Sequence, residues 1–418
     1  MGPAYRAAAR VLHRLPYPPG TLATSLAGRR AAAARWRDWA AGARGDGPLI
    51  WAHAASVGES LALQSVVARL RARARHLRIV LTHTSPSVAT HPPFRDFDRT
   101  DYLPLDEPGP VAAVLDALRP ALLLFSRGDL WPELVAGAAA RRIPVAVAGG
   151  MVRPRSGRLR APAVWALRPM YRVVAWVGAA GEGDAERWRR LGVPPDRITV
   201  TGDPRHDQVA ERIPDLRLAA RWRSGPRGAV LTVVAGSVEP ADDALLADAA
   251  GRAGDAWHWL VVPHDPDVRR VGRVEAAFRR RGVTVASWDA ESAPPPATQV
   301  TVLARRGLLA DLYWAADAAW VGGGFRDGGL HAVCEAAVVG LPVAAGPFLA
   351  SVRDGALLER AGSAVPVADA GALVAMLDAW AASPARRWDD GLAARGALET
   401  GAAERTAGVL ARLAGLTT

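Results

Sequence analysis

Two successive sets of short apolar runs place the strongest constraint on how this chain can fold. From residue 48 onward the runs alternate with amphipathic or alanine-rich stretches, and after an arginine- and proline-rich stretch the pattern restarts. Such alternation predicts βα units on parallel sheets. The predicted strands are Leu49–Ala52, Ile79–Thr82, Ala121–Phe125, Pro144–Ala148 and Val173–Val177 in the first set, and Ala229–Ala235, Trp259–Val262, Val300–Leu303, Ala318–Val321 and Pro342–Ala345 in the second.

The length of 418 residues also favours two domains, because single hydrophobic cores stop growing at about 250–300 residues. We therefore expect an α/β protein with two Rossmann-like domains. Ligands of open α/β sheets bind beyond the carboxyl ends of the strands, so the two domains should face each other across a cleft. The expected parts are an N-terminal helical segment (1–47), an N-terminal domain (48–208), a C-terminal domain (209–385) and C-terminal helices packing back on the N-terminal domain (386–418).

The first 47 residues contain two arginine-dotted stretches with helical spacing, Tyr5–Leu15 and Arg29–Ala40. A basic amphipathic segment can lie on an anionic bilayer surface, whereas a solvated capping helix is the alternative. We expect residues 1–45 to be removable without unfolding the rest. No run approaches the roughly 18 apolar residues of a membrane span.

The charge of the chain comes from 52 basic and 41 acidic residues, a net charge of +11, and every cation is arginine because the sequence has no lysine. Arginine suits phosphate and carboxylate partners, although genomic bias would give the same composition. A nucleic-acid-binding protein is a competing reading. The arginines are scattered, however, and no aromatic ladder is present, so no nucleic-acid partner is expected. A single cysteine, Cys334, excludes an internal disulfide and fits a reducing compartment.

The first candidate site follows the first predicted strand, in the segment Trp51–Ser60. Small residues, among them Ser56 and Gly58, allow a ligand to approach, and Glu59 falls at the start of the next helix. A carboxylate there can act as a catalytic base or can only complement the helix dipole. The sequence leaves both roles open.

The second candidate site is a glycine-rich loop between the predicted strand Ala318–Val321 and a helix expected near His331. Backbone N–H groups of Gly322–Gly324 and Gly328–Gly329, together with the helix N-terminus, could bind a phosphate. Glu335, one turn later, could accept hydrogen bonds from a ribose. The alternative is a glycine-rich turn with a surface glutamate. No metal-ligand cluster is evident, since the polar residues of 264–267 are typical of a solvent-facing or helix-capping loop.

The order and spacing of these motifs resemble the 3-deoxy-manno-octulosonic acid (Kdo) transferases over most of the chain. The resemblance is carried by Ser56-Val57-Gly58-Glu59, Asp129-Leu130-Trp131-Pro132, Gly202-Asp203-Pro204-Arg205-His206-Asp207, Ala235-Gly236-Ser237, Gly322-Gly323-Gly324-Phe325, Gly328-Gly329-Leu330-His331, Glu335 and Gly346-Pro347.

This resemblance implies a GT-B glycosyltransferase at the cytoplasmic face of the inner membrane, in peripheral contact with an anionic membrane surface. It implies a CMP-linked sugar donor in the second domain, a lipid A-type acceptor on the Glu59 side, and Glu59 as base of an inverting transfer. We expect no cofactor and no metal, because paired carboxylates of a metal-binding Asp-x-Asp type are not expected in this chain. The implied substrate-binding residues are Ser56, Gly58, Asp129, Trp131, Ser156, Arg205, Ser237, Gly323, Gly324, Gly328, Gly329, His331 and Glu335.

Several family positions differ in this chain, mainly where substrates should be recognised. Pro263-His264-Asp265 replaces Pro-Arg-His, so a phosphate-binding arginine is missing, and Arg326 is the candidate replacement. The remaining changes are Ala332 for asparagine, Leu308 for an acidic residue, Arg127 for glutamate and Gly149-Gly150-Met151-Val152-Arg153 for Asn-Ala-Arg-Leu-Ser. A nucleotide-sugar epimerase of the same architecture and a divergent inactive paralogue both stay open.

Overall fold

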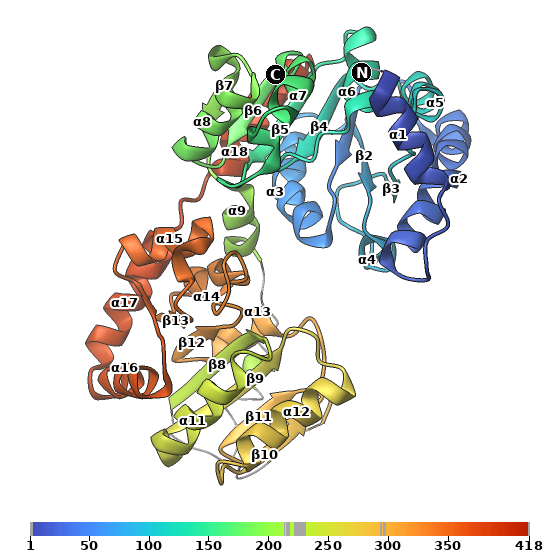
Figure 1. Cartoon of the computed structure of the whole chain (residues 1–418). Coiled ribbons are helices and arrows are strands. Elements are labelled where there is room, and N and C mark those ends of the chain that lie inside the picture. Colours follow the sequence, from blue (N-terminus) through green and yellow to red (C-terminus); the bar gives the residue numbers. More distant parts are fainter. Residues whose placement is uncertain are drawn as a thin grey trace. The chain divides into compact units, whose positions relative to one another are not determined.

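The computed structural model of the chain describes residues 3–212, 214, 218–220, 231–292, 295 and 298–416. The chain divides into two compact units, one made of residues 1–208 and 399–418 and the other of residues 209–398 (Figure 1). Each unit is built on its own seven-stranded parallel sheet. Every predicted strand overlaps an observed one, although the prediction for 229–235 begins outside the described residues.

The sheet of the first unit has the strand order β3-β2-β1-β4-β5-β6-β7. The chain adds strands toward one edge as far as β3 and toward the other edge from β4 onward, so the strand order switches between β1 and β4. Its elements are α1 (Pro3–Arg14), α2 (Thr21–Ala43), β1 (Leu49–His53), α3 (Val57–Arg73), β2 (Arg78–His83), α4 (Pro86–Ala89), β3 (Arg99–Tyr102), α5 (Pro108–Leu118), β4 (Leu122–Ser126), α6 (Pro132–Ala140), β5 (Val145–Gly150), η1 (Gly157–Leu159), α7 (Ala163–Arg172), β6 (Trp176–Ala179), α8 (Glu182–Leu191), η2 (Pro195–Arg197), β7 (Ile198–Val200), α9 (Pro204–Ala210) and α18 (Ala402–Leu413).

The central strands of this sheet are largely apolar because both of its faces are covered. In β1, Leu49 and Trp51 pack into a core shared with α2, α5 and α6, whereas Ile50 and Ala52 pack into a core shared with α3 and α18. A strand buried on both faces reads as a continuous apolar run. This double burial explains why the central strands were predictable from the sequence.

The sheet of the second unit has the strand order β10-β11-β9-β8-β12-β13-β14, and its strand order switches between β8 and β12. Its elements are β8 (Leu231–Val238), α11 (Asp243–Ala253), η3 (Gly254–Ala256), β9 (Trp257–Pro263), α12 (Val268–Arg279), β10 (Val285–Trp288), β11 (Val300–Leu303), α13 (Leu309–Leu312), η4 (Tyr313–Ala315), β12 (Ala318–Val321), α14 (Val333–Val339), β13 (Val343–Ala345), η5 (Leu349–Ser351), α15 (Arg353–Arg360), β14 (Ala364–Pro366), α16 (Ala370–Ala382) and α17 (Pro384–Gly396).

The last two helices belong to different units. Helix α17 packs on α14 and α16 in the second unit, and the return to the first unit comes after Leu398. Helix α18 packs on α3, and Figure 1 shows the two side by side. The Asp207 carboxylate accepts hydrogen bonds from the N–H groups of Gly401 and Ala403, at 2.5 and 3.0 Å, which fixes the start of α18.

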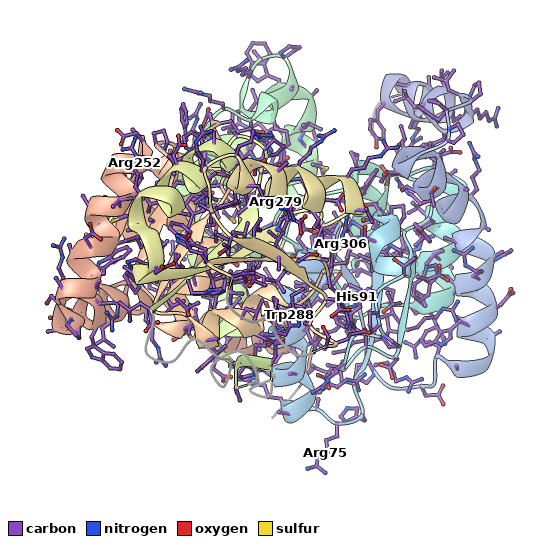
Figure 2. The ribbon with its side chains drawn as sticks, turned by 90° about the horizontal axis from the view of Figure 1, so that it is seen from below. Arg75, His91, Arg252, Arg279, Trp288 and Arg306 are labelled. Atoms are coloured by element: carbon purple, nitrogen blue, oxygen red, sulfur yellow. The ribbon has the colours of Figure 1, made fainter. Side chains whose placement is uncertain are left out.

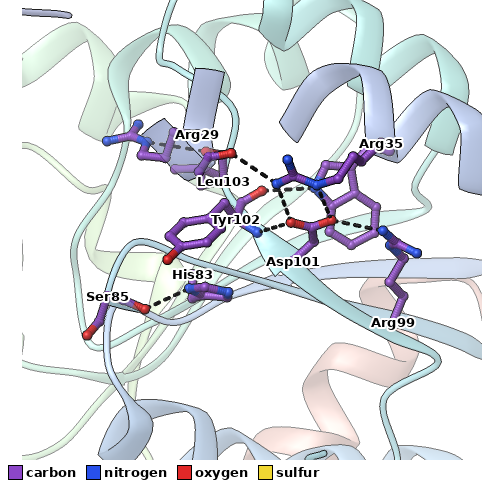
Figure 3. Close-up of polar contacts among 10 residues, drawn as sticks. Arg29, Arg35, His83, Ser85, Arg99, Asp101, Tyr102 and Leu103 are labelled. Carbon is purple, nitrogen blue, oxygen red and sulfur yellow. Dashed lines mark hydrogen bonds and ion pairs between the residues drawn. The ribbon is translucent and has the colours of Figure 1, made fainter. Parts of the chain in front are cut away.

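Helix α2 is part of the first unit's core, so the expectation that residues 1–45 are removable is wrong. Trp36 is fully buried, and its indole N–H donates to the Tyr102 carbonyl at 3.0 Å. Arg35 binds both oxygens of Asp101 at 2.5 and 2.8 Å, and Arg99 donates to the same carboxylate at 2.9 Å (Figure 3). Deleting α2 would expose this core and remove Arg35 from the Asp101 carboxylate.

Among the described residues, no helix combines the length and the apolar character that crossing a bilayer requires. The arginines of the chain are spread over many elements. Figure 2 shows Arg75 extending away from the ribbon after α3, and Arg252, Arg279 and Arg306 are exposed on α11, α12 and the loop after β11.

Candidate active site

Most of the predicted site residues lie at the ends of the strands at which the strand order changes direction, whereas Ser156 follows β5 and Arg205 follows β7. In the first unit β1 and β4 are neighbours, and they lead into the segments that contain Glu59 and Asp129. In the second unit β8 and β12 are neighbours, and they lead into Ser237 and the glycine loop. The carboxyl end of a parallel sheet at its point of reversal is where α/β proteins bind ligands.

Glu59 lies in the first turn of α3, and it is partly a helix cap. Its backbone N–H donates to Ser56 Oγ at 3.4 Å, and its Oε2 accepts from the Ala55 N–H at 2.9 Å. Among the described residues, none donates a hydrogen bond to Oε1. The cap therefore occupies one carboxylate oxygen and leaves the other available to a ligand.

The electrostatic surroundings of Glu59 favour the protonated carboxyl. Burial raises the pKa of Glu59 above its ordinary value and the Asp129 carboxylate raises it further, whereas the Ala55 N–H and Arg127 act in the opposite direction. A raised pKa makes a carboxylate a stronger base near neutral pH. Gly58 beside it is exposed, and a Cβ built there would meet nothing within 4 Å.

Arg127 connects the Glu59 region to the predicted residue Arg205. Its guanidinium contacts the buried Asp203 carboxylate at 3.5 Å, and Asp203 also accepts from the Arg205 backbone N–H at 2.9 Å. At this position the chain thus has a cation, Arg127, in place of the family glutamate, and it faces the Asp203 carboxylate. Arg205 contacts this network mainly through its backbone N–H, since its side-chain Nε lies 4.0 Å from the Asp203 carboxylate.

Ser156 is joined to the Asp129 loop by Arg158, a residue that the sequence analysis missed. Ser156 Oγ caps η1 by accepting from the Arg158 N–H and Nε, each at 3.4 Å. Arg158 in turn donates to the Gly128 carbonyl at 2.6 Å. No short motif could have singled out Arg158 among the many arginines of the chain, because its role depends on two loops that are brought together in space.

Trp131 is held by contacts within the protein. Its indole N–H donates to His53 Nε2 at 3.1 Å, and the Arg29 guanidinium lies 4.2 Å from the ring centroid. Arg29 is buried and donates to the carbonyls of Leu103 and Pro104. One polar atom of Trp131 and one side of its ring are therefore already in use, which favours a supporting role behind Glu59.

The glycines of the second-unit loop are required by close backbone packing. Gly323 has a φ of +84°, and a Cβ there would lie 3.0 Å from the His331 ring. A Cβ on Gly324 would lie 2.6 Å from the Gly346 backbone nitrogen. The Gly346-Pro347 motif is thus the partner that explains why Gly324 has no side chain.

Most N–H groups of these glycines are hydrogen-bonded within the protein, contrary to the phosphate cradle that the sequence suggested. Four of them donate to described residues: Gly322 to the Gly236 carbonyl at 2.9 Å, Gly323 to Asp242 at 3.1 Å, Gly328 to Ser351 Oγ at 3.0 Å and Gly329 to the Arg326 carbonyl at 3.0 Å. The N–H of Gly324 donates to no described residue. Helix α14 begins at Val333, two residues after His331.

His331, Glu239 and His264 meet at the carboxyl ends of β12, β8 and β9. His331 Nε2 lies 3.0 Å from Glu239 Oε1, and the two imidazole rings stack with centroids 4.0 Å apart. Glu239 and His264 were not predicted as site residues. Their proximity arises because three loops that are distant in sequence leave neighbouring strands.

The two Asp-x-Asp pairs of the chain have structural partners. Asp267 caps α12 by accepting from the Arg270 N–H at 2.7 Å, as expected, and Asp265 pairs with Arg306. In the first unit, Asp98 pairs with Arg71 at 2.6 Å. A cavity of about 360 Å³ adjoins the first of these pairs and is lined by Val238, Glu239, Pro240, His264, Asp265, Asp267, Arg269, Arg270 and Arg273.

Glu335 and Ser237 flank the same end of the second sheet. Glu335 is half-buried in α14 and, after burial itself, is the next largest cause of the raised pKa of the Tyr313 hydroxyl. Ser237 adopts a positive φ of 52° as β8 ends. The structure thus brings Ser237, the glycine loop, His331 and Glu335 to one end of one sheet, as the motif order predicted.

Two paired Rossmann-like units define the GT-B class, and solved structures agree with this fold. UDP-GlcNAc 2-epimerase from Neisseria meningitidis is similar with a TM-score of 0.61 at 12% identity, covering 87% of this chain and 100% of that chain. Acinetobacter baumannii MurG is similar with a TM-score of 0.56 at 13% identity, covering 88% and 100%.

Sequence relatives identify the family within this class. A family model described as 3-Deoxy-D-manno-octulosonic-acid transferase (kdotransferase) matches residues 28–208. The 3-deoxy-D-manno-octulosonic acid transferase of Bordetella pertussis is 31% identical over 386 residues, 88% of each chain, and that of Haemophilus influenzae is 26% identical over 308 residues, 71% of this chain and 70% of the relative. The chain belongs to the Kdo transferase family and is a glycosyltransferase.

Proposed function

We propose that this protein transfers Kdo or a related sugar acid from a CMP-activated donor to a lipid A precursor or a similar lipid. The single observation that carries the proposal is Glu59: in a Kdo transferase family member, it stands at the reversal point of the first sheet with an unengaged oxygen and a raised pKa. Asp129, which raises that pKa, and the network of Arg127, Asp203 and Arg205 surround it.

In the proposed reaction Glu59 Oε1 removes the proton from the acceptor hydroxyl. The hydroxyl oxygen then forms a bond to the anomeric carbon of the sugar, on the face opposite the phosphate. The bond from that carbon to the phosphate oxygen breaks, and CMP leaves with the electron pair, so the configuration is inverted. The proton ends on Glu59, and no step uses a metal ion.

The donor is proposed to bind at the carboxyl end of the second sheet. His331, Ser237 and the N–H of Gly324 are the groups for the phosphate, and Glu335 is the group for the ribose hydroxyls. Because Pro263-His264-Asp265 lacks the family arginine, another cation must offset the phosphate charge. The Arg326 guanidinium is exposed and is hydrogen-bonded to no described residue, which supports its assignment to this role.

A peripheral membrane contact is proposed for α1. One side of the helix is tied to the first unit, where Tyr5 donates to Asp106 at 2.6 Å and Arg6 to Glu133 at 2.9 Å. Val11, Leu12 and Leu15 are 59%, 53% and 44% exposed. Exposed aliphatic residues beside Arg10 and Arg14 suit the boundary between acyl chains and anionic headgroups. This contact would place the acceptor site at the cytoplasmic face of the inner membrane.

The decisive experiment incubates the full chain with CMP-Kdo, with and without a lipid A precursor, and measures CMP release together with the mass of the lipid. We expect acceptor-dependent CMP release and a lipid heavier by one or more sugar residues. Conversion of the donor sugar without an acceptor would instead indicate the epimerase. Binding of CMP without any turnover would indicate an inactive paralogue and would overturn the proposal.

The membrane contact is tested with the variant Leu12→Glu/Leu15→Glu and sedimentation with vesicles containing anionic phospholipid. The matched control is Leu392→Glu, since Leu392 is 48% exposed on α17. We expect the α1 variant to lose vesicle binding and the control to keep it, because each buried apolar side chain contributes about 1.5–3 kcal/mol. Equal sedimentation of both variants would exclude α1 as the contact.

A further inference from the structure

Glu239, His264 and His331 form a group of metal-binding side chains at the end of the second sheet. Each offers one ligand atom, and these atoms all lie within 4.8 Å of one another. The residues leave three strands that are adjacent in the sheet, in the order β9-β8-β12. The group therefore lies at the carboxyl ends of three neighbouring strands.

The backbone of each of the three ligands is held in place by a hydrogen bond, and for His264 the N–H donates to the Val238 carbonyl at 3.1 Å. The backbone N–H of His331 donates to the Gly322 carbonyl at 3.2 Å, and that of Glu239 donates to the buried Asp242 carboxylate at 2.7 Å. The Oε1 of Glu239 and the Nε2 of His331 lie 3.0 Å apart. The third ligand, His264, is exposed and can rotate about its side-chain bonds.

The distances fit a tetrahedral transition-metal ion after a small adjustment. Zinc binds imidazole nitrogen and carboxylate oxygen at about 2.0–2.2 Å, which places tetrahedral ligand atoms about 3.3–3.5 Å apart. Closing the group requires a movement on the order of 1 Å, which the exposed His264 can make. Two imidazoles and one carboxylate favour Zn²⁺ or Co²⁺ over Mg²⁺, whose preferred ligands are oxygens.

Three protein ligands leave the fourth tetrahedral position open. The cavity of about 360 Å³ is lined by Glu239 and His264, so water or a small anion can reach that position. The simpler alternative is that Glu239 only orients His331 and that His264 only stacks on it. This alternative predicts no saturable metal binding that depends on His264.

We propose that Glu239, His264 and His331 bind one divalent transition-metal ion, with Zn²⁺ as the probe, and that the bound ion competes with the donor nucleotide for His331. Metal binding itself is independent of the proposed function. The competition rests on the proposed function, because competition requires His331 to contact the donor phosphate. Zn²⁺ would then be an inhibitor of a transfer that itself uses no metal.

The first experiment titrates the metal-stripped full chain with Zn²⁺ by calorimetry, and repeats the titration with Co²⁺ by visible absorption. We expect one ion per chain, with tetrahedral cobalt bands, and an affinity at least about tenfold weaker in His264→Ala and Glu239→Gln. His91→Ala is the matched control, since His91 is a partly exposed histidine of the first unit, and it should bind as the parent does. Unchanged affinity in His264→Ala, or no saturable binding, would overturn the proposal.

The second experiment measures CMP affinity with and without saturating Zn²⁺. Competition predicts that each ligand weakens the other by the same factor, as linkage requires. If Zn²⁺ binds at the three residues and CMP affinity is unchanged, the competition and the assignment of His331 to the donor site both fail, whereas the metal site stands. If CMP binds and Zn²⁺ does not, the metal site fails and the donor site stands. His264→Ala removes an exposed side chain, so loss of binding in a variant with an unchanged melting temperature reports the site itself.

Discussion

The indole N–H of Trp131 donates a hydrogen bond of 3.1 Å to Nε2 of His53, and this contact fixes the tautomer of the buried histidine. Nε2 must be the acceptor, so the proton lies on Nδ1, which donates to Thr82 Oγ1 at 3.1 Å. Thr82 also accepts from Trp51 Nε1 at 2.9 Å and donates to the Ala52 carbonyl at 3.2 Å. The chain of donors and acceptors is complete only while His53 is neutral.

This network predicts a loss of stability at acid pH. Burial, with the nearby Arg29 charge adding to it, lowers the pKa of His53 to about 3. The unfolded chain therefore binds this proton before the folded one does. The stabilisation is present above the ordinary histidine pKa and is lost as pH falls from about 6.5 toward 3.

Urea unfolding at pH 7 and pH 5 measures this effect. We expect the first unit to be less stable at pH 5 by on the order of 1–2 kcal/mol from this group alone. His53→Gln retains side-chain hydrogen-bonding groups but cannot titrate, so its stability should change less between the two pH values. An equal change in the parent protein and in His53→Gln would assign the pH dependence to other groups.

The contact between Gly324 and Gly346 predicts that a methyl group cannot be added at either position. A Cβ on Gly346 would lie 2.6 Å from the Gly324 carbonyl carbon, and backbone atoms cannot move aside cheaply. Gly346→Ala should cost roughly 1–3 kcal/mol and displace the loop. Gly272→Ala, in α12 with nothing within 4 Å, should stabilise by about 0.5–1 kcal/mol. Thermal unfolding and CMP binding of both variants check this, and a Gly346→Ala protein as stable as the parent contradicts the observed packing.

The strands that the sequence analysis missed are the four edges of the two sheets. β3, β7, β10 and β14 are only partly buried, unlike the fully buried central strands. An edge strand has a neighbour on one side only, so its sequence does not need the continuous apolar run that revealed the central strands. The segment Arg99–Tyr102 is polar because its side chains bind α2 rather than a second layer of core.

The placement of a candidate site residue could be predicted from the sequence where that residue lies at the end of a central strand or in the segment after it. Glu59, Asp129 and His331 follow central strands, Ser237 lies at the end of one, and the parallel topology places such segments at the carboxyl ends of the sheets. The meeting of His331 with His264 and Glu239 depends on strand order, which apolar periodicity does not encode. Likewise, the sequence does not reveal whether the N–H of a glycine is already hydrogen-bonded. The N–H of Gly323, for example, donates to the Asp242 carboxylate.

Gly58 provides a test of substrate contact that is separate from folding. It lies in the first turn of α3, where alanine has the higher helix propensity, and the position of its Cβ is open. Gly58→Ala should keep or raise the melting temperature, with a gain of up to about 1 kcal/mol. If the acceptor occupies that open space, the variant should bind the acceptor more weakly and raise its KM at unchanged CMP affinity. Unchanged acceptor kinetics would remove Gly58 from the acceptor site.

The last prediction separates Glu59 as a base from Glu59 as a helix cap by using the sign of its pKa shift. Because burial raises the pKa, the folded protein binds this proton more tightly than the unfolded chain does. Stability contributed by the protonated form is present at acid pH and is lost as pH rises through the interval above the ordinary glutamate value. Glu59→Gln is always neutral and keeps an acceptor for the Ala55 N–H, so its melting temperature at pH 7 should equal or exceed that of the parent.

Turnover should respond in the opposite way. Loss of the base should slow transfer by roughly 10²–10⁴-fold at unchanged CMP affinity. In the parent, kcat/KM for the acceptor should fall as pH drops through the raised pKa of Glu59, and the residual activity of Glu59→Gln should lack this acid limb. A cap alone predicts nearly normal turnover, because glutamine keeps the acceptor for the Ala55 N–H. The two roles therefore differ in turnover, and the melting temperature and the donor affinity of the same variant show whether a loss of turnover comes from unfolding or from a damaged donor site.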